Sequence, residues 1–315
     1  MSLYEHGWYQ LAFERDLSSP ITPLSYGGQP FMAVWSPASG RPRVFDAVCP
    51  HRGAHLARGG RLAGDAVVCP FHAYRIGLGV ESRDGFCVRE YESLLRGGGL
   101  FARLSDRSEV DFPEALEALG AGHAFVPGFE MTARTTIEVV IENGFDNAHF
   151  RSVHGLMSLP ELTVRRGPFG ELQAEGRFEI PRTGWYEAPD AEGRNLGARY
   201  VAHAFSPGVF ISELDGDPPY RYRIMTTATP TDAPRECIIR LTLMLPQGPE
   251  GPPLDGRFAQ ELLEHSRAGL EQDRRIWDHL SPGHKPRLTA ADQAAAAFAE
   301  FCRGFRGRYG STKLS

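Results

Sequence analysis

The stretch CPHRGAHLARGGRLAGDAVVCPFH, residues 49–72, contains two cysteines and two histidines in two short arms. Cys49 and His51 form a Cys-x-His arm, and Cys69 and His72 form a Cys-x-x-His arm after a gap of 17 residues. Zinc fingers usually place two cysteines in one arm and two histidines in the other. Mixed arms suit a [2Fe–2S] centre with two cysteines on one iron and two histidines on the other. The stretch therefore predicts such a cluster, with a structural zinc site or scattered core residues as the alternatives.

The whole chain has the composition of a globular protein. Of its 315 residues, 42% are hydrophobic and 23% are charged, and the net charge of −5 indicates neither nucleic acid nor an acidic membrane surface as a partner. No apolar run approaches the about 18 residues of a membrane span, and the N-terminus lacks a signal-peptide pattern. Five cysteines, an odd number, argue against a disulfide framework. We therefore expect a cytoplasmic protein without a membrane segment.

The pattern of strands and turns divides the chain near residue 110. Short β-like runs broken by Gly and Pro fill residues 30–110 and predict a small all-β unit that carries the Cys/His stretch on its loops. A short helix is predicted at residues 111–119, and TTIEVVIE, residues 135–142, alternates like a strand. Strand-like runs between residues 176 and 245 predict an antiparallel sheet. Helical segments are predicted at roughly residues 256–280 and 290–305.

A second group of possible metal ligands lies in ENGFDNAHFRSVHG, residues 142–155. Asp146 and His149 are three residues apart and would share a helical face. His149 and His154 are five apart, so their rings would point about 140° apart on a regular helix. If both bind one ion, the helix must end between them; otherwise they are partly buried histidines beside a surface aspartate. Next to a one-electron cluster, the pattern indicates the 2-His-1-carboxylate site of non-haem Fe(II) oxygenases.

These motifs resemble those of the Rieske non-haem iron oxygenases. GWYQLAF, CPHRGAHL and CPFHAYRIG are similar to the Rieske domain, and DNAHFRSVH matches the family's Asp-x-x-His-x4-His motif. The resemblance implies that the cluster ligands are Cys49, His51, Cys69 and His72. It also implies that His149 and His154 bind a mononuclear iron. Asp146 would be no ligand; it would bridge His149 to His72 of a neighbouring chain and orient the imidazole.

The third iron ligand is expected far downstream. The stretch LEQDRRIWDHL, residues 270–280, offers the carboxylates Glu271, Asp273 and Asp278. Its QD…IW pattern resembles ketosteroid hydroxylase-type members of the family and favours Asp273. Leu270, Ile276 and Trp277 would surround Asp273 with an apolar helix face. A solvated helix carboxylate is the alternative for each of the three.

The resemblance also implies a fold and a function. The expected α+β fold has an all-β Rieske domain at residues 1–110 and a helix-grip-like catalytic domain at residues 111–315, with a twisted antiparallel sheet flanked by helices. The chain would be a terminal oxygenase, a monooxygenase or dioxygenase that takes electrons from NAD(P)H through a separate reductase, with or without a ferredoxin. It would use O2 to hydroxylate, desaturate or demethylate a hydrophobic polycyclic or aromatic substrate, and it would form a homotrimer. The alternative is a Rieske ferredoxin-like electron-transfer protein, although such a carrier needs only about the first 110 residues.

Overall fold

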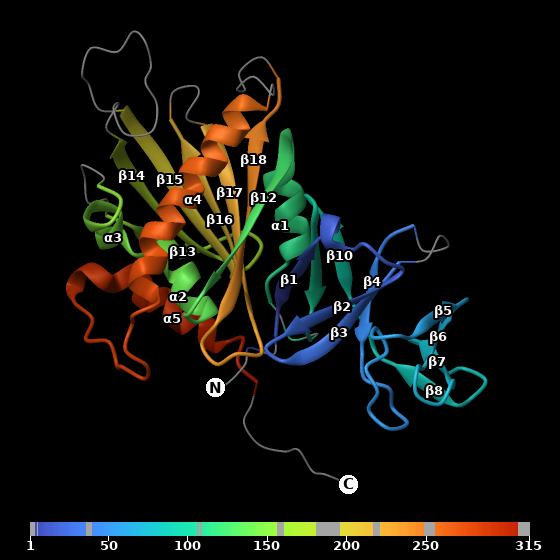
Figure 1. The fold of residues 1–315 in the computed structure, drawn as a ribbon. Helices are drawn as coiled ribbons and strands as arrows, with labels where there is room; N and C mark the ends of the chain where they lie inside the picture. The colour runs from blue at the N-terminus through green and yellow to red at the C-terminus, as the bar shows by residue number, and fades with distance from the viewer. Residues whose placement is uncertain are drawn as a thin grey trace.

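The chain folds into an N-terminal part made of small β-sheets and a C-terminal part built around a large antiparallel sheet (Figure 1). The computed structural model describes residues 4, 6–35, 40–105, 107, 109–155, 161–180, 196–216, 221–248 and 256–307. The N-terminal elements are β1 (Trp8–Phe13), η1 (Glu14–Asp16), β2 (Ile21–Tyr26), β3 (Gln29–Val34), β4 (Arg43–Asp46), β5 (Arg61–Ala63), β6 (Ala66–Val68), β7 (Arg75–Leu78), β8 (Phe86–Val88), β9 (Glu90–Tyr91), β10 (Ser93–Arg96) and β11 (Gly99–Arg103). They form sheets in the orders β1-β11-β10, β2-β3-β4-β9 and β5-β6-β7-β8. The predicted all-β N-terminal region is therefore confirmed.

The Cys/His loops have a hydrophobic core of their own. Phe45 and Val67 are fully buried there, and Cys49 belongs to the same cluster. Tyr9 of β1 and Phe101 of β11 belong instead to the core of the C-terminal part. The core of the large sheet thus continues into the N-terminal strands, and the boundary predicted between residues 110 and 111 stays a prediction.

The C-terminal part is a layered structure of sheet and helices. Its strands are β12 (His123–Ala133), β13 (Thr163–Arg166), β14 (Leu172–Ile180), β15 (Leu196–Ser206), β16 (Val209–Asp215), β17 (Arg221–Pro230) and β18 (Cys237–Pro246). Its helices are α1 (Phe112–Gly120), α2 (Ile137–Glu142), η2 (Asn143–Phe145), α3 (Asn147–Ser152), α4 (Arg257–Trp277), η3 (Ala290–Asp292) and α5 (Gln293–Arg303). The strand order is β12-β18-β17-β16-β15-β14-β13, with antiparallel neighbours throughout. The predicted sheet flanked by helices is confirmed.

The two faces of the large sheet have different neighbours. Thr226 of β17 lines a pocket together with residues of α3 and α4. Because side chains alternate along a strand, the next residue, Thr227, points to the other face, where its hydroxyl donates to Gln10 Oε1 of β1 at 2.8 Å. The pocket therefore opens on the helix-covered face, and the N-terminal part packs against the opposite one.

The prediction of a strand at residues 135–142 is wrong, because Ile137–Glu142 forms helix α2. Ile137, Val140 and Ile141 are buried at the i, i+3, i+4 spacing of a helix. The β-branched residues that suggest a strand pack instead against β17 and α5. Tertiary packing therefore overrides their intrinsic preference here.

The remaining helix predictions are correct within a few residues at the ends. Helix α1 begins after Asp111, whose side chain accepts a hydrogen bond from Glu114 N at 3.1 Å and caps the first turn. Helix α4 occupies most of the predicted segment, but Ile276, predicted on its apolar face, is 48% exposed. None of the described helices is long and apolar enough to cross a bilayer.

Candidate metal centres

Two loops of the same shape carry the Cys and His residues of the first motif. In the first loop, Cys49 N donates to Ala54 O at 2.8 Å and Gly53 N donates to Cys49 O at 2.9 Å. In the second loop, Cys69 N donates to Tyr74 O at 2.9 Å and Ala73 N donates to Cys69 O at 3.1 Å. The fourth residue after each cysteine adopts a left-handed conformation, with φ of 75° at Gly53 and 58° at Ala73. Each sequence arm therefore folds into an equivalent turn with its cysteine at the base.

The four side chains of these loops face one another in matching pairs. Cys49 and Cys69 are only 2% and 3% exposed and their thiols interact, while the ring centroids of His51 and His72 lie 4.8 Å apart. Burial raises the pKa of Cys49, and the neighbouring thiol raises it further. Two thiolates could not sit there without a cation between them. The buried sulfur pair and outer imidazole pair thus fit a [2Fe–2S] centre with mixed ligands.

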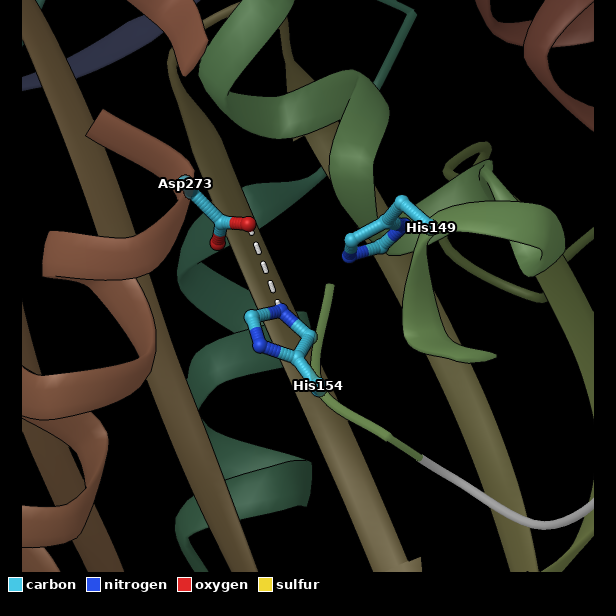
Figure 2. Close-up of side chains that lie close together, drawn as sticks. All are labelled: His149, His154 and Asp273. Atoms are coloured by element: carbon cyan, nitrogen blue, oxygen red, sulfur yellow. Dashed lines mark ion pairs between the residues drawn. The ribbon is translucent and has the colours of Figure 1, made fainter. Parts of the chain in front are cut away.

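The two histidines of the second motif lie beside Asp273 of the downstream helix, as predicted from the sequence. His149 on α3, His154 after α3 and Asp273 on α4 each offer one ligand atom, and these atoms all lie within 4.8 Å of one another. Figure 2 shows the three side chains gathered in a triangle, with a dashed line joining His154 to Asp273. The distance from His154 Nε2 to Asp273 Oδ1 is 3.3 Å. Their side chains are 7–12% exposed. Two imidazoles and one carboxylate are the donors of non-haem Fe(II) sites, so this group fits a mononuclear iron.

The local fold explains how two histidines five residues apart can converge. Asp146 caps α3 by accepting from Ala148 N at 3.0 Å and His149 N at 3.4 Å. The helix ends at Ser152, and Gly155 adopts a left-handed conformation with φ of 70°. The chain therefore leaves the helical path between His149 and His154, which allows both rings to point towards one ion.

The electrostatics of the group favour one neutral and one proton-sharing imidazole when no metal is bound. Burial lowers the pKa of His149, and the charges of Asp273 and Asp146 offset this only in part. Burial also acts to lower the pKa of His154, but its hydrogen bond to Asp273 outweighs the burial and raises that pKa. A cation among these residues would take the place of the proton shared by His154 and Asp273.

The other two candidate carboxylates of α4 have different partners. Glu271 forms an ion pair with Arg274 at 2.7 Å. Asp278 accepts a hydrogen bond from Arg134 N at 2.7 Å, beyond the end of the helix. The structure thus brings Asp273 to the two histidines and leaves the alternatives outside.

A pocket of about 210 Å³ opens directly on this group, and all three candidate ligands form part of its wall. Most of the lining is aromatic or aliphatic, including Phe150, Phe178, Tyr200, Phe210 and Tyr222. None of these residues was predicted individually from the sequence. Alternating aromatic positions in the strand-like runs were the available signal, but strand register decides which of them face the pocket.

The two candidate centres lie far apart within one chain. Figure 1 places the loops around β5–β8 at one end of the molecule, and α3 with the lower half of α4 at the other. Asp146 lies beside its own His149, with Oδ2 3.9 Å from Nδ1. Its predicted bridge to His72 of a neighbouring chain stays a prediction.

Two protein-family models match separate parts of the chain, and each part contains one of the two candidate centres. Residues 7–88 match the Rieske [2Fe-2S] domain model, and residues 106–300 match the model of the 3-Ketosteroid 9alpha-hydroxylase C-terminal domain. Cholesterol 7-desaturase nvd of Hemicentrotus pulcherrimus is 30% identical over 65% of this chain and 46% of its own length. The 3-ketosteroid-9-alpha-monooxygenase oxygenase component of Rhodococcus rhodochrous is 23% identical over 92% of this chain and 78% of its own length.

The chain is shorter than several of its relatives, and its fold is similar to that of solved structures. The chain spans 46%, 18% and 38% of the cholesterol 7-desaturase nvd proteins of Hemicentrotus pulcherrimus, Xenopus laevis and Bombyx mori. Among solved structures, dicamba monooxygenase bound to 3,6 dichlorosalicylic acid superposes with a TM-score of 0.72 at 16% identity, covering 97% of this chain and 98% of that one. Pseudomonas putida CBB5 NdmA also has a TM-score of 0.72, at 14% identity and 95% and 89% coverage. At such identities the likeness establishes the fold.

Proposed function

Because the chain belongs to the Rieske oxygenases with a 3-ketosteroid 9alpha-hydroxylase type C-terminal domain, we propose that it is the terminal oxygenase component of a Rieske system. The observation that carries the proposal is the convergence of His149, His154 and Asp273 in the wall of an apolar pocket. An iron held there would lie next to whatever the pocket binds. A Rieske carrier protein has no need of such a second site.

Each centre has its own task in the proposed reaction. Cys49, His51, Cys69 and His72 would hold the cluster, which would supply one-electron transfer. His149, His154 and Asp273 would hold the iron, which would supply O2 activation, and three protein ligands would leave positions for other ligands. The protein contributes neutral imidazoles, a carboxylate whose charge offsets that of the metal, and walls that keep water from the bound substrate.

The substrate is proposed to be hydrophobic and either polycyclic or aromatic. The pocket-facing side chains of β15, β16 and β17 include Tyr200, Phe210 and Tyr222, and aromatic walls favour flat apolar molecules. Gly144, another wall residue, accepts a hydrogen bond from the Tyr200 hydroxyl at 3.0 Å, so the phenol is held against the wall. Hydroxylation, desaturation and demethylation all remain within the proposal.

Electron delivery is proposed to involve other chains. A separate reductase, with or without a ferredoxin, would pass electrons from NAD(P)H to the cluster. Since the two centres lie at opposite ends of one chain (Figure 1), the route to the iron would cross to a neighbouring copy in a homotrimer. Asp146, at the N-terminus of α3, would then connect His72 of one chain with His149 of the next.

Iron analysis of the purified protein tests the proposal. We expect about three irons per chain, two in a coloured cluster and one in the second site. Asp273→Ala is expected to keep the cluster spectrum, to lower the count to about two, and to abolish O2-dependent oxidation of a hydrophobic substrate panel. Glu271→Ala is the matched control on the same helix and should change neither the iron count nor the oxidation activity. A wild-type count of two with an intact cluster would favour the electron carrier instead.

A further inference from the structure

The orientation of a metal-binding histidine is decided by the partner of its other ring nitrogen. His149 Nδ1 lies 2.6 Å from the backbone carbonyl of Asp146. A carbonyl can only accept, so the proton must be on Nδ1 and the lone pair of Nε2 is free for a metal. The backbone carbonyl of Asp146, the residue that caps α3, therefore sets the tautomer of this ligand.

His154 has a less decisive partner. Its Nδ1 lies 3.0 Å from Oε1 of Gln272, and its Nε2 lies 3.3 Å from Asp273 Oδ1. A glutamine amide can accept through its oxygen or donate through its nitrogen. If the oxygen faces the ring, Nδ1–H donates to it and Nε2 is free to bind a metal. If the amide turns over, the proton moves to Nε2 and blocks the position beside Asp273.

We propose that Gln272 is a positioning residue, which holds His154 in the tautomer that can bind the mononuclear iron. Helix α4 thus contributes two consecutive residues with different tasks. Asp273 is buried and lies beside Nε2 of His154. Gln272 is exposed and lies beside Nδ1 of the same imidazole. This inference rests on the proposed iron site, and it adds a residue that touches neither the metal nor the pocket.

The test is a Co(II) titration of protein that retains its cluster but has lost its mononuclear metal. Gln272→Met keeps the length of the side chain and removes the acceptor, so Co(II) affinity should fall by about 10–100-fold. Gln272→Glu can only accept at neutral pH and should bind Co(II) at least as tightly as the wild type. Rescue by glutamate and not by methionine would not be expected if the residue only filled space.

A control lies on the same helix. Gln260 is also exposed and donates from Nε2 to Glu264 Oε1 at 3.1 Å, far from the ligands, so Gln260→Met should leave Co(II) affinity unchanged. The cluster absorption and the unfolding midpoint of each variant establish that the fold is intact. Co(II) affinity of Gln272→Met within about threefold of the wild type would overturn the inference, as would an equal loss in Gln272→Glu. Wild-type protein that binds no Co(II) would overturn the proposed iron site as well.

Discussion

Replacing Glu213 by glutamine should destabilise the protein by about 3 kcal/mol at mildly acidic pH. On the sheet face opposite the pocket, Glu213 accepts from His203 Nε2 at 2.6 Å and from Arg223 Nε at 2.7 Å. Burial acts to raise the pKa of Glu213, but the bond from His203 and the charge of Arg223 outweigh it and lower the pKa from 4.5 to about 2. The side chain is only 18% exposed, so solvent screens these contacts weakly. A lowering of that size corresponds to about 3 kcal/mol.

The pH dependence of the stabilisation follows from the pKa shifts of Glu213 and His203. The Glu213 contribution is fully present above the ordinary pKa of 4.5 and is lost as the pH falls towards 2. Burial acts to lower the pKa of His203, but its bonds to Glu171 and Glu213 outweigh this and raise it. The His203 contribution is therefore present below about pH 6.5 and is lost as the pH rises through the raised value. The difference between wild type and Glu213→Gln should be largest between about pH 4.5 and 6.5.

Urea unfolding followed by tryptophan fluorescence, at intervals from about pH 4.5 to 9, measures this difference. Asp215→Asn is the matched control, because Asp215 on the same strand pairs with Arg221 at 2.8 Å but is 47% exposed. Its cost should stay below about 1 kcal/mol at every pH. A Glu213→Gln cost that is below about 1 kcal/mol, or that does not change with pH, would refute the reasoning.

Three further changes test other parts of the structure. Asp146→Asn should retain about three irons per chain but stop reoxidation of the reduced cluster in the presence of substrate and O2, as followed by visible absorption; normal reoxidation would exclude the bridging role. Ala73→Gly should be neutral or stabilising by about 1 kcal/mol in urea unfolding, because the non-glycine residue has a φ of 58°; a clear loss of stability would contradict this. Gly144→Ala would place a Cβ 2.3 Å from the Phe210 ring, and substrate-difference spectra should show at least tenfold weaker binding, whereas unchanged binding would mean that the pocket lies elsewhere.

Local motifs made the N-terminal part and its ligands predictable. The loops around Cys49 and Cys69 are short, so the spacing alone assigns one sulfur and one imidazole to each loop. The carboxylate is different, because α4 follows the whole sheet and nothing local connects Asp273 to His154. The prediction of Asp273 rests on the QD…IW resemblance, and the structure places this residue beside the two histidines.

The errors arose where packing decides the outcome. The β-branched residues of α2 alternate over a short run, and only their burial against β17 and α5 reveals a helix. Ile276 is hydrophobic yet lies on the exposed side of α4, while the neighbouring Trp277 is buried. The pocket aromatics depend on strand register, which a single sequence does not specify.

The wide spacing of the two centres along the molecule (Figure 1) has a consequence for the enzyme in dilute solution. Under the proposed arrangement, an isolated subunit could carry its full complement of iron and still be unable to turn over. Specific activity would then rise with protein concentration. Mixing subunits inactivated at the cluster with subunits inactivated at the iron site would restore part of the activity.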